Sequence, residues 1–236
     1  MPRGWNVVDR ETPVLMREYR FPAGLATCCG IGFGSGELAV FSPPGGLDDQ
    51  AFAELDAHGD VTAIIPPNGY HSLGLSDFAR RYPQATLYAA PDAARRIGRK
   101  NARLPAFTPI DELRRRVAPD IEILEPPQLR VSDLMVMVRT EGGWIWYVND
   151  VITNLRKLPK PPLLRLAFSI VGTRPGICFN GVFRTFIMRD KKAFARWMHE
   201  QLEHRPPVKM VFGHGEHVET PTLCDDLRRL TDATFG

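Results

Sequence analysis

Short strand-like runs alternate with short helix-like segments along the whole sequence, and this alternation limits the folds that the chain can adopt. Val61–Ile65 is a β-branched run of the kind found in buried strands, and two prolines follow it. Pro91–Lys100 is predicted to be a helix with proline at its first position, where a missing N–H costs nothing. Asp190–His204 is predicted to be a helix capped by Asp190. Strands and helices in this order predict an α/β protein with sheets inside and helices outside.

The length and composition favour one globular domain over residues 1–236. The chain has 44% hydrophobic and 24% charged residues, which excludes a disordered, collagen-like or coiled-coil chain. A chain of this size buries about 70–75% of the surface that its unfolded form exposes, so its core needs no disulfides. Residues 157–181 are rich in proline and poorly periodic. We therefore predict an irregular excursion over the surface there, as a lid or as the contact of a homo-oligomer.

The sequence predicts a reduced, cytoplasmic protein with no membrane partner. No apolar run approaches the roughly 20 residues that cross a bilayer, and residues 1–6 lack the apolar core of a signal peptide. The cysteines form no C-x-x-C pair, so we interpret them as small buried thiols rather than zinc ligands or disulfides. They are Cys28, Cys29, Cys178 and Cys224.

A basic stretch over residues 80–116 holds ten lysines and arginines against three acidic residues, a local net charge of +7. Such a stretch can mark an anionic substrate or a nucleic acid, or it can be a solvated helix face. No aromatic residue occurs in residues 92–106, so the stacking platform of a single-strand binder is missing there. We therefore do not expect a nucleic-acid partner.

Three loops that follow apolar strands carry side chains of the type that bind ligands. They contain His71, Asp150 and His214, and glycines flank His214 on both sides, which allows a ligand to approach closely. Two imidazoles and one carboxylate make a ligand set for Zn²⁺ or Fe²⁺, and such a site can lower the pKa of bound water. The alternative is that these side chains are hydrogen-bonded loop residues without a metal.

Five short motifs follow one another in a fixed order over roughly residues 36–217. They are Phe41-Ser42-Pro43, Pro67-Asn68-Gly69-Tyr70-His71, Tyr82-Pro83-Gln84-Ala85, Asn149-Asp150-Val151-Ile152-Thr153-Asn154 and Gly213-His214-Gly215. In this order they resemble the metallo-β-lactamase superfamily. More narrowly, they resemble a branch of that superfamily that is described only as a domain of unknown function and has a degenerate metal motif.

The resemblance implies an αββα four-layer sandwich with its metal site at one edge of the two sheets. The superfamily's first metal motif, His-x-His-x-Asp-His, falls on residues 66–71, where only His71 matches and Tyr70 replaces the aspartate. The metal-bridging aspartate corresponds to Asp150 and the final histidine to His214. The ligands of the superfamily's other metal are absent, so the resemblance implies one metal rather than two.

By this resemblance we expect a metal-dependent hydrolase with one divalent metal, zinc first and iron or manganese as alternatives. The substrate is an unidentified small molecule, anionic if the basic stretch borders the pocket. The alternative is a metal-free, catalytically inactive relative that binds a small molecule or a protein. The expected metal ligands and catalytic residues are His71, Asp150 and His214, with Asp150 orienting the attacking water, and the expected substrate contacts are Asn68, Tyr70 and His217.

Overall fold

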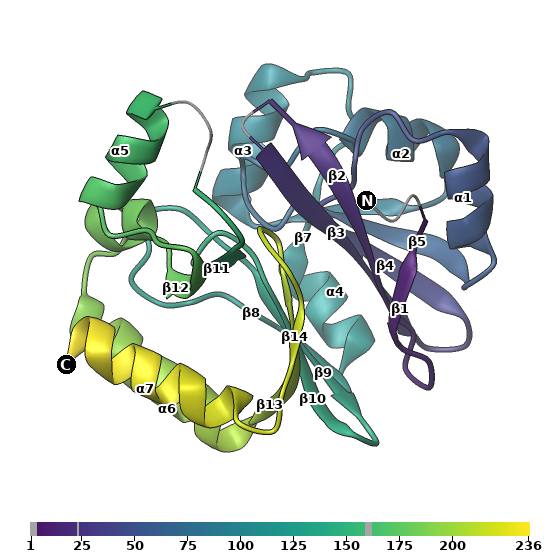
Figure 1. The fold of residues 1–236 in the computed structure, drawn as a ribbon. Helices are drawn as coiled ribbons and strands as arrows, with labels where there is room; N and C mark the ends of the chain where they lie inside the picture. The colour runs from purple at the N-terminus through teal and green to yellow at the C-terminus, as the bar shows by residue number, and fades with distance from the viewer. Residues whose placement is uncertain (1–3, 23, 159–161) are drawn as a thin grey trace. The chain divides into compact units, whose positions relative to one another are not determined.

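The computed structural model describes residues 4–22, 24–158 and 162–236 of the chain (Figure 1). The chain divides into two compact units, residues 1–122 and 123–236, which are called unit 1 and unit 2 below. The prediction of a single domain over residues 1–236 stays a prediction.

Unit 1 contains a seven-stranded sheet whose strands lie side by side in chain order. The pairs from β1 to β4 are antiparallel. The pairs from β4 to β7 are parallel, because a helix connects each strand to the next. The strands are β1 (Asn6–Asp9), β2 (Val14–Phe21), β3 (Gly24–Phe33), β4 (Glu37–Phe41), β5 (Asp60–Ile65), β6 (Thr86–Ala89) and β7 (Thr108–Pro109).

Four helices accompany this sheet, and their apolar side chains form its core. Phe52 and Phe78 pack edge to face with ring centroids 5.3 Å apart, and both belong to the same buried cluster as Ile64 of β5. Asp48 caps the first helix by accepting a hydrogen bond from the Ala51 N–H. The helices are α1 (Asp49–Asp56), α2 (Leu75–Arg81), α3 (Pro91–Lys100) and α4 (Ile110–Val117).

Unit 2 is built on a five-stranded sheet in the order β14-β13-β10-β9-β8, and β11 and β12 form a separate antiparallel pair. β10 runs parallel to β13 and antiparallel to β9. The strands are β8 (Ile121–Leu124), β9 (Met135–Thr140), β10 (Gly143–Val148), β11 (Ile152–Leu155), β12 (Gly176–Phe179), β13 (Pro207–Phe212) and β14 (Val218–Glu219).

The helices of unit 2 are α5 (Pro162–Ile170), α6 (Lys191–His204) and α7 (Leu223–Phe235), with a short π-helical turn, η1, over Phe183–Ile187. Phe179 of β12 packs against Phe194 of α6 and Phe235 of α7, with ring centroids 5.6 and 4.8 Å apart. Trp146 of β10 is fully buried, and its indole N–H donates to the Arg205 carbonyl at 2.9 Å. This hydrogen bond satisfies the one polar atom that the ring brings into the core.

The predicted α/β class is confirmed, but residues 157–181 differ from the irregular excursion that the sequence predicts. They contain α5 and β12, and β12 pairs with β11 in four residue positions. Pro162 occupies the first position of α5, where proline is tolerated, so proline content alone was a poor guide to this segment. Residues 159–161 of the predicted excursion, and residues 1–3 of the segment predicted not to be a signal peptide, lie outside the described residues.

The cysteines are free, as the sequence predicts, and three of them are buried. Burial raises the pKa of the Cys28 and Cys29 thiols. Thiols held in the neutral form are weak nucleophiles, so these side chains behave as small apolar groups. Among the described helices, none has the length and apolar character needed to cross a bilayer.

Replacing Asp190 tests the predicted N-cap of α6. Asp190 accepts a hydrogen bond from the Ala193 N–H at 2.9 Å. We expect Asp190→Ala to lower the free energy of unfolding by about 1 kcal/mol, because one N–H of the first turn loses its acceptor. Asp190→Ser, which keeps an acceptor, should lose much less. Urea unfolding followed by circular dichroism measures both, and equal stability of the two variants would contradict this role of Asp190.

Candidate functional site

The end of the β10–β13 pair brings Asp150 and His214 together. The two strands are parallel neighbours with Val148 opposite Phe212, so both strands end at the same edge of the sheet. Asp150 and His214 are each the second residue after their strand. His214 Nε2 lies 2.9 Å from Asp150 Oδ1, and the two side chains are 16% and 14% exposed. Unit 2 thus presents an imidazole and a carboxylate in direct contact, within reach of solvent.

Glycines on both sides of His214 allow the turn that carries it to pack closely against Asn149 and Asn154. A Cβ on Gly213 would overlap the side-chain oxygen of Asn149. A Cβ on Gly215 would overlap the carbonyl of Asn154, and Gly215 also has a φ of +118°, which L side chains rarely adopt. The Gly213 N–H donates to the Val148 carbonyl at 2.7 Å, which fixes the turn on the neighbouring strand. The two glycines are thus required by packing against Asn149 and Asn154, and the close approach of a ligand to His214 stays a prediction.

A fully buried carboxylate, Asp133, holds the residues on both sides of Asp150, one through its side chain and one through its main chain. Its Oδ1 accepts from the Asn149 side-chain N–H at 3.0 Å, and its Oδ2 accepts from the Val151 main-chain N–H at 2.9 Å. Hydrogen bonds of this kind offset the cost of burying a charge-bearing group. Sequence reasoning missed Asp133, although an aspartate that directly precedes the apolar run 134–138 was a usable signal.

Unit 1 also brings polar side chains together beyond the end of a parallel strand pair, β4–β5. Phe41 lies opposite Ile65, and the Ser42 N–H donates to the Ile65 carbonyl at 2.9 Å. The Ser42 hydroxyl lies 2.7 Å from His71 Nδ1 and 2.7 Å from the Tyr19 hydroxyl. His71 is 8% exposed and Ser42 is fully buried. Ser42 therefore engages Nδ1 of His71, and Nε2 is the ring atom that a metal would use.

The three predicted substrate contacts lie in different environments. Asn68 is fully buried, and its side-chain oxygen accepts from the Tyr70 N–H at 2.8 Å, so it shapes the loop that ends at His71. Tyr70 is 54% exposed, and the Arg96 guanidinium lies over its ring, 4.0 Å from the centroid. His217 is exposed. Substrate contact by these residues stays a prediction.

The basic stretch over residues 80–116 is partly neutralised by acidic residues of unit 1. Arg81 pairs with Asp56 at 2.5 Å, and Arg114 pairs with Asp111 at 2.6 Å. Ion pairs on an exposed surface contribute little to stability, but they reduce the local field. These pairs are typical of solvated helix faces. They favour that interpretation of the stretch over a binding site for an anionic substrate or a nucleic acid.

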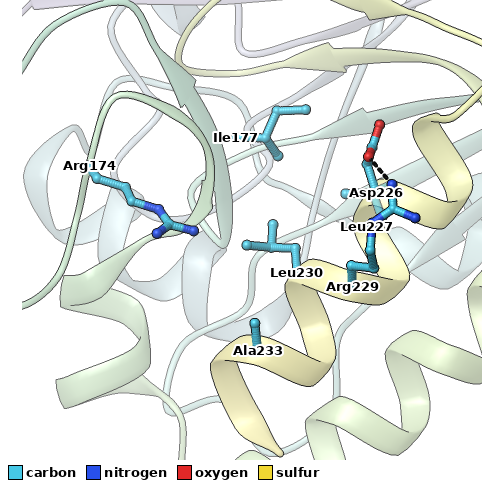
Figure 2. Close-up of a pocket in the computed structure, with 7 residues that line it drawn as sticks. All are labelled: Arg174, Ile177, Asp226, Leu227, Arg229, Leu230 and Ala233. Carbon is cyan, nitrogen blue, oxygen red and sulfur yellow. Dashed lines mark hydrogen bonds and ion pairs between the residues drawn. The ribbon is translucent and has the colours of Figure 1, made fainter.

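A separate pocket of about 320 Å³ lies between β12 and α7 (Figure 2). Ile177, Leu227 and Leu230 give it an apolar floor, Arg174 extends towards it from one side, and the Asp226–Arg229 ion pair borders the other. None of the predicted site residues lines this pocket. Its chemistry is therefore distinct from that of the Asp150–His214 pair.

No family model and no curated protein matches the chain, but solved structures do. The metallo-β-lactamase FIM-1 from Pseudomonas aeruginosa in its mono-zinc form matches with a TM-score of 0.59 and 11% identity, over 98% of this chain and 95% of that chain. The chain has the metallo-β-lactamase fold. DIM-1 metallo-β-lactamase (TM-score 0.58, 13% identity, 98% and 97% coverage) and a metallo-β-lactamase from Erythrobacter litoralis (0.60, 10%, 97% and 96%) are also similar.

These likenesses confirm the fold that the order of the sequence motifs predicts. At such low identity they establish the metallo-β-lactamase fold and leave substrate and activity open. Within this fold, the loops that carry His71, Asp150 and His214 each begin where a central strand of a sheet ends. The sequence prediction that ligand-type side chains follow strands is therefore confirmed for all three residues.

Replacing Asp133 tests its role as the support of the Asp150 loop. We expect Asp133→Ala to lower the free energy of unfolding by about 3 kcal/mol, because two buried donors lose their acceptor. Asp120→Ala, which changes an exposed aspartate, should alter it by less than about 0.5 kcal/mol. Urea unfolding followed by tryptophan fluorescence measures both variants. Equal stability of the two would show that Asp133 does not support the loop.

Proposed function

We propose that the protein is a hydrolase-type enzyme with one divalent metal, zinc before iron or manganese, bound by His71, Asp150 and His214. The observation that carries the proposal is the Asp150–His214 pair at the ends of two parallel strands. Likeness to metallo-β-lactamases over nearly the whole chain supports it, and one of those structures is a mono-zinc form.

The donor chemistry of the three residues suits such a metal. Each offers one ligand atom, an imidazole nitrogen or a carboxylate oxygen, and two imidazoles with one carboxylate are a common set for Zn²⁺ and Fe²⁺. Metal-binding histidines usually have their second ring nitrogen held by a hydrogen bond, and Ser42 holds Nδ1 of His71 in this way. Asp133 gives the loop of Asp150 a comparable support.

A divalent ion in this set supplies Lewis acidity and lowers the pKa of water towards neutrality. The Asp150 carboxylate would accept a hydrogen bond from the attacking water and orient it towards the substrate. We assign direct substrate contact to Tyr70 and His217, while Asn68 acts through the loop that it shapes. The Arg96 guanidinium against the Tyr70 ring favours a small substrate that carries negative charge.

A second candidate function is that of a metal-free module that binds a small molecule or a protein. The direct contact between His214 Nε2 and Asp150 Oδ1 favours it, because each of these polar atoms then satisfies the other. The two candidates differ in one measurable quantity, the metal content.

Elemental analysis of protein purified without chelator tests the metal directly. We expect about one zinc, iron or manganese per chain. The metal should be lost in Asp150→Ala and His214→Ala, because each removes a ligand. His199→Ala is a matched control, since His199 Nε2 also lies 2.9 Å from an aspartate, Asp232, on the exposed α6–α7 surface. No metal after incubation with each ion would leave the metal-free module as the function, and equal loss in the control would contradict a metal site built from His71, Asp150 and His214.

Replacing Ser42 tests whether it orients a metal-binding His71. We expect Ser42→Ala to weaken metal affinity about 10- to 100-fold with the stoichiometry unchanged, because the imidazole loses the partner that fixes its ring. Ser76→Ala, which changes an exposed serine of α2, should leave the affinity unchanged. Titration against a competing chelator gives both affinities. An unchanged affinity in Ser42→Ala would assign Ser42 to folding alone.

A further inference from the structure

Residues 151–189 form the longest stretch of the sequence without an acidic residue. They carry seven basic residues, so this segment alone has a formal charge of +7, against +3 for the whole chain. The segment spans β11, α5, β12 and η1 of unit 2. The basic residues are Arg156, Lys157, Lys160, Arg165, Arg174, Arg184 and Arg189.

The same segment exposes large apolar side chains. Leu163, Leu166 and Ile170 of α5 are 83%, 57% and 75% exposed, and Phe186 of η1 is 61% exposed. Positions i, i+3 and i+7 of a helix lie on one face, so the three α5 residues form a continuous apolar stripe. A stripe of this kind on an otherwise polar surface indicates a binding face rather than scattered surface residues.

Hydrogen bonds join the end of α5 to the start of η1, so the exposed residues belong to one part of unit 2. The Arg184 guanidinium donates to the Val171 carbonyl at 3.1 Å, and the Gly181 N–H donates to the Thr173 hydroxyl at 2.9 Å. Figure 1 shows α5 at the periphery of unit 2, beside the β11–β12 pair. We define the α5 face by two sets of residues. Its exposed apolar residues are Leu163, Leu166, Ile170 and Phe186, and its exposed basic residues are Lys157, Arg165 and Arg174.

Several cations of the α5 face have no acidic partner within the described residues. Lys157, Arg165 and Arg174 are exposed, and none of them forms an ion pair with a described carboxylate. Arg156, in contrast, pairs with Glu216 and lowers the pKa of that carboxyl. The α5 face therefore combines an apolar stripe with three exposed cations that no described carboxylate pairs with.

We propose that the α5 face docks this protein onto an anionic lipid bilayer. Apolar side chains of an interfacial helix enter the boundary between headgroups and acyl chains, and surrounding lysines and arginines are attracted by anionic lipids. Positive charge disfavours a second copy of the same face as the partner, since two such faces repel each other. The expectation of no membrane partner rested on the lack of a spanning segment, which peripheral docking does not require.

Vesicle flotation tests the proposal with the full chain. We expect the protein to float with vesicles that contain phosphatidylserine and much less with phosphatidylcholine alone. Leu166→Ser combined with Ile170→Ser should lower the bound fraction about tenfold or more, because both side chains lose their apolar contact with lipid. Arg165→Gln combined with Arg174→Gln should reduce binding to phosphatidylserine vesicles by a similar factor.

Matched controls distinguish binding through the α5 face from nonspecific hydrophobic or electrostatic adsorption to vesicles. Val7→Ser removes an exposed apolar side chain of β1, and Arg115→Gln removes an exposed cation of α4, so neither should change flotation. Absent flotation, or equal flotation of wild type and α5 variants, would overturn the proposal. Self-association can be measured by analytical ultracentrifugation. If the wild type self-associates and the Leu166→Ser/Ile170→Ser variant does not, the proposal is overturned and the α5 face is the contact of a homo-oligomer. We expect the same flotation with and without chelator, so failure of this proposal and failure of the proposed metal site are distinguishable.

Discussion

Parallel pairing of neighbouring strands is the constraint on which the loops of His71, Asp150 and His214 depend. Hydrogen bonds between β10 and β13 place Val148 opposite Phe212, and those between β4 and β5 place Phe41 opposite Ile65. Because parallel strands end at the same edge, the polar residues that follow them meet there without further design. A register slip of one residue would reverse which side chains face the core, so the buried strands also fix the loops.

Buried polar side chains make these loops rigid. Asp133 is fully buried and holds both neighbours of Asp150, while Ser42 links His71 to Tyr19. In the low dielectric of a protein interior, such bonds are strong when complete and costly when one partner is missing. The supports therefore have the physical character of a preorganised site, in which reactive side chains are held before a ligand arrives.

Charge is distributed unevenly along the chain, and this separates two surfaces with different chemistry. The segment 151–189 carries +7, whereas Asp150, which directly precedes it in sequence, contributes a carboxylate that contacts the His214 imidazole. The proposed metal site needs a polar environment, whereas the proposed membrane-facing stripe needs an apolar one. The exposed apolar side chains lie on α5 and η1, whereas Asp150 and His214 follow β10 and β13, so different elements of unit 2 carry the two sets of side chains.

Local chemistry determined much of what the sequence alone could predict. The periodicity of α6 and its Asp190 cap, the proline at the start of α3, and the glycines beside His214 each act within a few residues, so sequence reveals them. Only the tertiary structure decided that Asp133 supports Asp150, that Ser42 and Tyr19 support His71, and that residues 157–181 contain α5 and β12. These features depend on contacts between residues far apart in the chain, which strand pairing and burial create and which no local pattern records.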